Sequence, residues 1–162
     1  MKINYCLECA APLTKDTDSH YTCQNGHDFW NNAKATVAVV VVRDNKVLVS
    51  KRGREPFKGQ YDLPGGFVDY GEDPFQTAVR ELDEETGLVI NPESLRIITA
   101  YHSLYFENDS LCDIIMLAKD WRGEPEAQDD SEALAWQPFE FIDSDQFSPT
   151  YTGLSKLILD YV

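Results

Sequence analysis

The sequence predicts an α/β (α+β) fold, a sandwich of a mixed sheet and helices that follows a small N-terminal module. Apolar runs that suit strands lie both before and after one well-marked helix, and the chain closes with a second helix-like segment. Such an order is typical of layered mixed folds. The first 32 residues differ in composition from the rest, and 162 residues leave room for one ordinary domain and a small appendage.

The strands of the larger domain are predicted from apolar runs and turn signals. Residues 35–42 are apolar except for Thr36 and mostly β-branched, as in a strand that is buried on both faces. Asp44-Asn45 is a turn signal, so residues 46–52 continue as a second strand. The remaining predictions are strands at 61–63, 95–106, 111–119 and 133–139, a polar turn at 107–110, an acidic loop at 123–131 and a closing helix at 151–162.

The clearest helix is predicted to begin after Asp73 and to end before Gly87. Asp73 is a good N-cap, Pro74 suits the first helical position, and Gln76 completes a capping-box pattern. Gly87 is a typical C-terminal stop. One face of this helix is mostly apolar, because five residues fall on it at helical spacing: Phe75, Ala78, Val79, Leu82 and Thr86.

The second half of this helix carries carboxylates where local rules disfavour them. Glu81, Glu84 and Glu85 span an arc of roughly 100° next to the apolar face. Like charges three and four positions apart repel, and anions near a helix C-terminus oppose the helix dipole, each at a cost of a few tenths of a kcal/mol up to about 1 kcal/mol. A hard divalent cation such as Mg²⁺ or Mn²⁺ would reverse this balance. The helix therefore carries a candidate metal site.

The spacing of these carboxylates is that of a known motif. The Nudix box G-x5-E-x7-R-E-U-x-E-E-x-G-U, in which U is a bulky aliphatic residue, is matched at every fixed position by Gly66, Glu72, Arg80, Glu81, Leu82, Glu84, Glu85, Gly87 and Leu88. The sequence therefore resembles the Nudix hydrolase family. The resemblance implies a Nudix-type α/β/α sandwich over residues 33–162.

The resemblance also implies the ligands of a catalytic metal. Glu81, Glu84 and Glu85 would bind Mg²⁺ or Mn²⁺, with the backbone carbonyl of Gly65 as a further ligand. Glu81 would also be the general base for the attacking water. Such a centre neutralises phosphate charge, acidifies water and aligns it for attack on phosphorus.

Four further residues have roles that are implied by position. Glu72 and Arg80 would orient the glutamate cluster, and Glu132, in the loop after the box, would add a metal ligand or act as a base. The alternative for Glu132 is one more charge in an acidic loop. Arg52, just before the box, is the candidate contact for substrate phosphate.

The N-terminal module holds a candidate zinc site. Cys6, Cys9, Cys23 and His27 offer four ligands at spacings that suit a tetrahedral structural Zn²⁺ ion, and His20 is an alternative fourth ligand. A segment this small could hardly order itself without a metal. Residues 1–32 are therefore predicted to be a zinc-ribbon-like module, similar in layout to that of NADH pyrophosphatases. The alternative is a set of free thiols in a frayed terminus.

Together these features predict a Mg²⁺-dependent hydrolase that cleaves the diphosphate linkage of a nucleoside diphosphate joined to another moiety. The dinucleotide, ADP-ribose and nucleotide-sugar classes are all candidates. The S-Q-P-W-P-F-P-x-S motif of NADH pyrophosphatases is absent, which disfavours NADH. The alternative is a catalytically weak Nudix-fold module that senses a ligand or binds a protein through its zinc ribbon. The number of costly acids argues against it.

The amino-acid composition limits the kinds of molecule that the protein is expected to bind. Lys and Arg total 14 against 28 Asp and Glu, a net charge of -14, so the surface repels nucleic-acid phosphates and the expected partner is a small-molecule nucleotide. The longest apolar run, residues 37–42, is too short to cross a bilayer, and no signal peptide is evident, so a cytoplasmic protein without membrane association is expected. A homodimer is compatible with the resemblance, because many Nudix enzymes are dimers.

Overall fold

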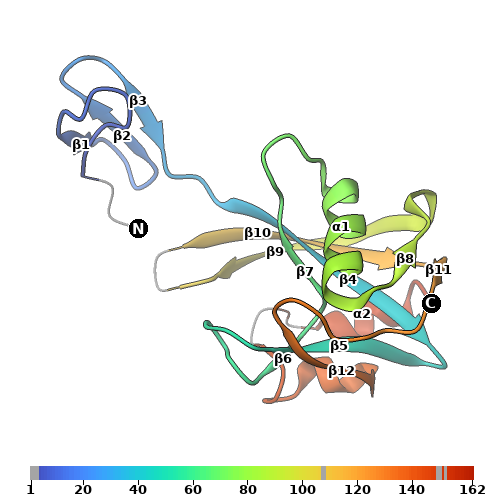
Figure 1. Ribbon diagram of the computed structural model, residues 1–162. Coiled ribbons are helices and arrows are strands. Elements are labelled where there is room, and N and C mark those ends of the chain that lie inside the picture. Colours follow the sequence, from blue (N-terminus) through green and yellow to red (C-terminus); the bar gives the residue numbers. More distant parts are fainter. Residues whose placement is uncertain (1–3, 107–108, 149–150, 152) are drawn as a thin grey trace.

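The computed structural model describes residues 4–106, 109–148, 151 and 153–162. Figure 1 shows a small N-terminal sheet that lies apart from a larger body, in which a sheet is covered by helices. The small sheet is antiparallel and consists of β1 (Leu13–Lys15), β2 (His20–Cys23) and β3 (Asp28–Trp30). Residues 31–33 connect it to the larger body.

The larger body is built on a seven-stranded mixed sheet of order β12-β5-β4-β10-β9, with β6 beside β5 and β7 beside β4. Among the described strands, β4 and β10 pair in parallel and the other pairs are antiparallel. The strands of the sheet are β4 (Lys34–Arg43), β5 (Lys46–Arg52), β6 (Tyr61–Asp62), β7 (Gly65–Phe67), β9 (Leu95–Leu104), β10 (Ser110–Ala118) and β12 (Ser131–Pro138). A separate antiparallel pair joins β8 (Val89–Ile90) to β11 (Trp121–Arg122).

Helices cover both faces of this sheet, and β4 shows why. Val37, Val39 and Val41 point into one core, which includes residues of α1 (Pro74–Thr86). Ala38 and Val40 point into the other, which includes residues of the 3-10 helix η2 (Phe139–Asp143) and of α2 (Leu154–Leu159). Because successive side chains of a strand face opposite ways, a continuously apolar strand needs cover on both sides. The predicted α/β/α sandwich is confirmed.

The ends of α1 follow the predicted capping chemistry. The Asp73 carboxylate accepts hydrogen bonds from the backbone N–H groups of Phe75 and Gln76, at 2.8 and 2.9 Å, and the Gln76 side chain accepts from the Asp73 N–H at 2.9 Å. Gly87 ends the helix in the left-handed conformation, with φ at 67°. Both backbone ends of the helix therefore have the partners that a stable helix requires.

The buried face of α1 differs at one position from its predicted apolar face. Phe75 is 39% exposed, whereas Thr77 is fully buried. The hydroxyl of Thr77 donates to the Glu72 carboxylate at 2.8 Å and lies 3.2 Å from the backbone oxygen of Asp73. These partners remove the cost of burying a hydroxyl, so Thr77 occupies the face on which an apolar residue was expected.

Several predicted boundaries also shift. Strand β9 ends at Leu104 instead of residue 106, β12 begins at Ser131 instead of residue 133, and the Gly65-Gly66 pair continues into the short strand β7. The closing helix is shorter than predicted, because Tyr151 is buried in the core and the helix begins only after Gly153. Residues 107–108 of the predicted turn lie outside the described residues. A further 3-10 helix, η1 (Pro92–Ser94), precedes β9. Among the described residues, no helix is long and apolar enough to cross a membrane.

Candidate active site and zinc-binding cluster

The Gly65-Gly66 pair lies directly against the carboxylates of α1. A Cβ atom at Gly65 would lie 2.0 Å from the backbone oxygen of Val37, and one at Gly66 would lie 2.2 Å from Oε1 of Glu81. The Gly65 N–H donates to Oε2 of Glu85 at 3.0 Å. A side chain at Gly65 would collide with the backbone of β4, and one at Gly66 would displace the Glu81 carboxylate, so the backbone itself forms one wall of the carboxylate cluster.

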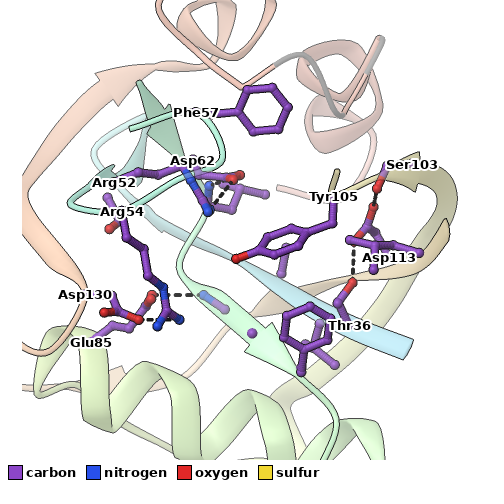
Figure 2. A pocket seen from close by; sticks show the side chains of 18 of the residues that line it. Thr36, Arg52, Arg54, Phe57, Asp62, Glu85, Ser103, Tyr105, Asp113 and Asp130 are labelled. Carbon is purple, nitrogen blue, oxygen red and sulfur yellow. Dashed lines mark hydrogen bonds and ion pairs between the residues drawn. The ribbon is translucent and has the colours of Figure 1, made fainter. Parts of the chain in front are cut away.

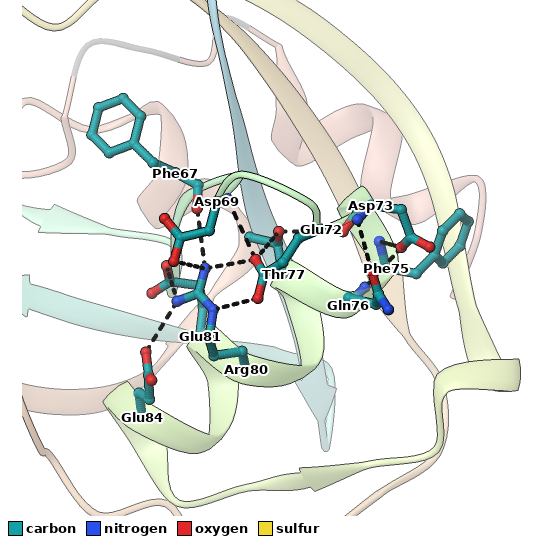
Figure 3. A network of polar contacts seen from close by, with 10 residues as sticks. All are labelled: Phe67, Asp69, Glu72, Asp73, Phe75, Gln76, Thr77, Arg80, Glu81 and Glu84. Atoms are coloured by element: carbon teal, nitrogen blue, oxygen red, sulfur yellow. Dashed lines mark hydrogen bonds and ion pairs between the residues drawn. The ribbon is translucent and has the colours of Figure 1, made fainter.

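Arg80 donates hydrogen bonds to three of the four glutamates of the box (Figure 3). Its Nε and Nη2 donate to the two carboxylate oxygens of Glu72, at 2.9 and 3.0 Å. Its Nη1 donates to Glu81 at 2.8 Å and to Glu84 at 3.1 Å, and Nη2 also donates to the backbone oxygen of Phe67 at 3.1 Å. Hydrogen bonds from Arg80, with others, lower the pKa of Glu72 to about 2. The orienting roles expected for Glu72 and Arg80 fit this network.

Glu81 and Glu85 are partly buried acids that Arg80 compensates only in part. Burial raises the pKa of Glu85 to about 8, although the hydrogen bond from Gly65 opposes the rise and the charge of Glu81 adds to it. Burial also raises the pKa of Glu81. Glu84 is about half exposed. Carboxylates in such surroundings ionise readily only when a cation lies beside them, so this donor set fits a hard divalent ion.

A cavity opens beside these carboxylates, with about 850 Å³ of space including its mouth. Figure 2 shows Glu85 and Asp130 on one side of it, Asp113 on the other, and Tyr105 between them. Its walls come from β4, β5, β7, β9 and β10 and from the loop after β5. The cavity is open to solvent, and its walls offer charged and aromatic groups to a ligand.

Two ion pairs lie in the walls of the cavity. Arg52, the predicted phosphate contact, pairs with Asp62 at 3.2 Å and donates from Nε to the backbone oxygen of Pro56 at 2.8 Å. Arg54 pairs with Asp130. Both arginines line the cavity and come from β5 or the loop after it. Phosphate groups that entered the cavity would therefore meet two guanidinium groups that are already fixed in place.

The acidic loop before β12 presents a residue that the sequence did not single out. Asp130 lines the cavity, and its backbone oxygen accepts from the Gly53 N–H at 3.0 Å. Glu132, the predicted loop acid, is 44% exposed on its side chain, lies 3.7 Å from Lys51, and is not among the residues that line the cavity. Which of several acids turns inward depends on how the loop docks, which sequence spacing does not specify.

The four predicted zinc ligands converge in the N-terminal module. The ligand atoms of Cys6, Cys9, Cys23 and His27 all lie within 4.8 Å of one another. The Sγ atoms of Cys9 and Cys23 are 3.8 Å apart, and Cys6 Sγ is 3.4 Å from Nδ1 of His27. Tetrahedral zinc with bonds of about 2.3 Å to sulfur places its sulfur ligands roughly 3.8 Å apart. The geometry therefore fits a structural zinc ion.

Other contacts support this assignment of the ligands. Hydrogen bonds from the backbone of Ala11 and the side chain of Asn25, with smaller contributions from other groups, lower the pKa of the Cys9 thiol to about 6, which favours the thiolate that binds metal. His20, the alternative ligand, instead contacts Asp28 at 2.9 Å and stacks on Trp30. It is not part of the cluster.

Substitution of Cys9 by Ser should remove the zinc. We expect about one zinc per wild-type chain by atomic emission and much less in Cys9→Ser, with increased proteolysis within residues 1–32, because the small sheet has few buried apolar side chains of its own. The matched control is Cys112→Ser, which replaces an exposed cysteine of β10 and should keep its zinc. Zinc-free wild-type protein with freely alkylated cysteines would contradict the assignment.

The pH dependence of stability should report the burial of Asp62. Burial raises its pKa to about 6, against an ordinary value of 3.8, although Arg52 opposes the rise. Between these values the folded protein binds more protons than the unfolded chain, so wild-type stability falls as the pH rises. Relative to Asp62→Asn, the wild-type free energy of unfolding should fall by up to about 3 kcal/mol between pH 4 and pH 7 in urea titrations. A flat or rising difference would refute this, and the exposed control Asp83→Asn should show none.

Comparison with known proteins agrees with this geometry. The family model described as the NUDIX domain matches residues 33–159. An ADP-ribose pyrophosphatase of Methanocaldococcus jannaschii is 34% identical over 124 residues, which are 76% of this chain and 69% of that protein. An 8-oxo-dGTP diphosphatase of Haemophilus influenzae is 32% identical over 116 residues, 70% of this chain and 80% of that protein. The crystal structure of a MutT NUDIX hydrolase from Burkholderia pseudomallei superposes with a TM-score of 0.65 at 26% identity, over 81% of this chain and 98% of that chain. The chain belongs to the Nudix hydrolase family and is a pyrophosphohydrolase.

Proposed function

We propose that this enzyme hydrolyses the diphosphate linkage of a nucleoside diphosphate joined to another moiety, of the dinucleotide, ADP-ribose or nucleotide-sugar class. The observation that carries the proposal is the position of two partly buried carboxylates, Glu81 and Glu85, next to a cavity that Arg52 and Arg54 line. The relatives named as ADP-ribose pyrophosphatase and 8-oxo-dGTP diphosphatase support a nucleotide substrate.

The residues of the box would hold Mg²⁺ or Mn²⁺ through Glu81, Glu84, Glu85 and the carbonyl of Gly65. When bound, the metal would neutralise phosphate charge and acidify water. Arg80 holds the cluster in place through its hydrogen bonds to Glu72, Glu81 and Glu84. Glu81, whose pKa is raised by burial, would accept the proton of the attacking water.

The two cavity arginines would bind the phosphates of the substrate. Arg52 is fixed by Asp62 and by the backbone of Pro56, so it would lose little conformational freedom on binding. Arg54 is 65% exposed on its side chain and would exchange Asp130 for a phosphate oxygen. We also propose that residues 1–32 form a zinc-ribbon-like module and residues 33–162 the hydrolase domain, in a cytoplasmic protein.

Removal of one carboxylate charge should slow the reaction strongly without unfolding the protein. We expect Glu84→Gln to lower kcat by on the order of 100-fold, because the partly exposed glutamine would keep the packing but lose a metal ligand. The matched control is Asp83→Asn, the neighbouring exposed acid, which should retain wild-type activity. Turnover would be measured with Mg²⁺ over NADH, ADP-ribose, nucleotide sugars, diadenosine polyphosphates and nucleoside triphosphates. No turnover of any of these, together with tight binding of one of them, would favour a ligand-sensing module instead.

Asp130, in the loop before β12, and Glu132, near the start of β12, can be separated by the same assay. Asp130 lines the cavity beside Glu85, so Asp130→Asn should lower kcat by about 10-fold or more. Glu132→Gln should have the larger effect only if the role implied by the family resemblance belongs to Glu132. Binding of Mn²⁺, followed by electron paramagnetic resonance, would show which carboxylate is a metal ligand. Equal loss in both variants would mean that the loop acts as a unit.

A further inference from the structure

The side of the cavity opposite Glu85 holds a buried carboxylate with no role in the chemistry described above. Asp113 is 4% exposed and lines the cavity. The hydroxyl of Thr36 donates to its Oδ1, and the hydroxyl of Ser103 donates to its Oδ2. These residues lie on the three neighbouring strands β4, β9 and β10, and Figure 2 shows the three side chains together. The strands therefore fix the position of this acid.

Each oxygen of Asp113 keeps room for one more hydrogen bond. A carboxylate offers about four acceptor positions, two on each oxygen, and the two hydroxyls occupy one on each. Within the described part of the chain, no Lys, Arg or His lies within ion-pair distance of Asp113, and Arg52 is paired with Asp62. A ligand group beside Asp113 would therefore meet two parallel acceptors that carry an uncompensated charge.

This charge decides which part of a nucleotide can lie there. Asp113 has no cationic partner among the described residues, so a phosphate next to it would be repelled. The phosphates belong on the other side, with Arg52, Arg54 and the glutamates. Tyr105 lies between the two sides, with its ring edge-on to Phe67 at a centroid distance of 5.4 Å. An aromatic ring at this place gives a planar base a surface for stacking.

We propose that Asp113 selects a guanine base, by accepting hydrogen bonds from its N1–H and its 2-amino group. Guanine alone among the common bases carries two adjacent N–H donors on one edge. Adenine and cytosine place an acceptor nitrogen beside their amino group, and uracil flanks its single N–H with two carbonyls, so each would bring an acceptor against the carboxylate. The substrate would then be a guanosine diphosphate joined to another moiety, which rests on the proposed function for the position of the phosphates.

The first test changes the ligand and leaves the protein intact. Binding of GMP, IMP, AMP, CMP and UMP to the full-length protein would be measured by calorimetry. GMP should bind about 10-fold more tightly than IMP, which lacks only the 2-amino group, because a buried acceptor that loses its partner costs heavily. The other three monophosphates should bind more weakly still. Equal affinity for GMP and IMP would overturn the proposal.

The second test changes the acceptor. Asp113→Asn replaces two acceptors by one acceptor and one donor, a pattern that matches the amino group and ring nitrogen of adenine. AMP should then bind at least as tightly as GMP, whereas the matched control Asp83→Asn, on the exposed face of α1, should keep the preference for GMP. A variant that weakens all five ligands alike, or that still prefers GMP, would contradict a role in selection. If Asp113→Asn fails to fold, the comparison of GMP with IMP on the wild-type protein decides alone.

Hydrolysis separates this proposal from the proposed function. Turnover of GDP-linked and ADP-linked sugars would be compared in the presence of Mg²⁺. A GMP preference without any turnover would leave the role of Asp113 standing and contradict the proposed hydrolysis. Turnover with equal kcat/KM for both nucleotide series would support the hydrolysis and overturn the selection of guanine.

Discussion

The contact between the backbone of β7 and the carboxylates of α1 is the constraint on which the site depends. Gly65 and Gly66 leave no space for a side chain on either side, and this absence brings Glu81 and Glu85 against the strand. Their burial raises the pKa of both acids, so a bound cation would stabilise their ionised forms. A side chain at Gly65 would collide with the backbone of β4, and one at Gly66 would displace the Glu81 carboxylate, so strand packing and the position of the acids depend on these two glycines.

The positive charge of Arg80 offsets part of the repulsion between these acids. From sequence alone the helix appeared to gather like charges with little to offset them, yet one guanidinium contacts three of these acids. Its planar group reaches Glu72 with two parallel hydrogen bonds, which a lysine could not do. Glu85 has no such contact with Arg80 in the described structure, which leaves this acid most dependent on a metal.

The sequence predicted the elements and contacts that depend on short spacings. The capping box of α1, the glutamates of the box and the four zinc ligands each lie within 25 residues of chain, and the structure brings each group together. Asp113 and its partner Thr36 are 77 positions apart and meet only because β10 pairs in parallel with β4. Asp130 faces the cavity because of how its loop docks. Such contacts arise from strand pairing over long distances, which local patterns do not encode.

The loop before β12 is fastened to α1 through main-chain groups. The N–H groups of Glu126 and Gln128 donate to the backbone oxygens of Thr86 and Glu85, at 2.9 and 3.1 Å, so the C-terminal carbonyls of the helix are satisfied by the loop. None of these bonds depends on the identity of a side chain. The enzyme can therefore exchange the residues of this loop, and with them the groups offered to a substrate, while the anchoring of the loop stays intact. Changes of side chain in this loop would therefore have little effect on the stability of the fold.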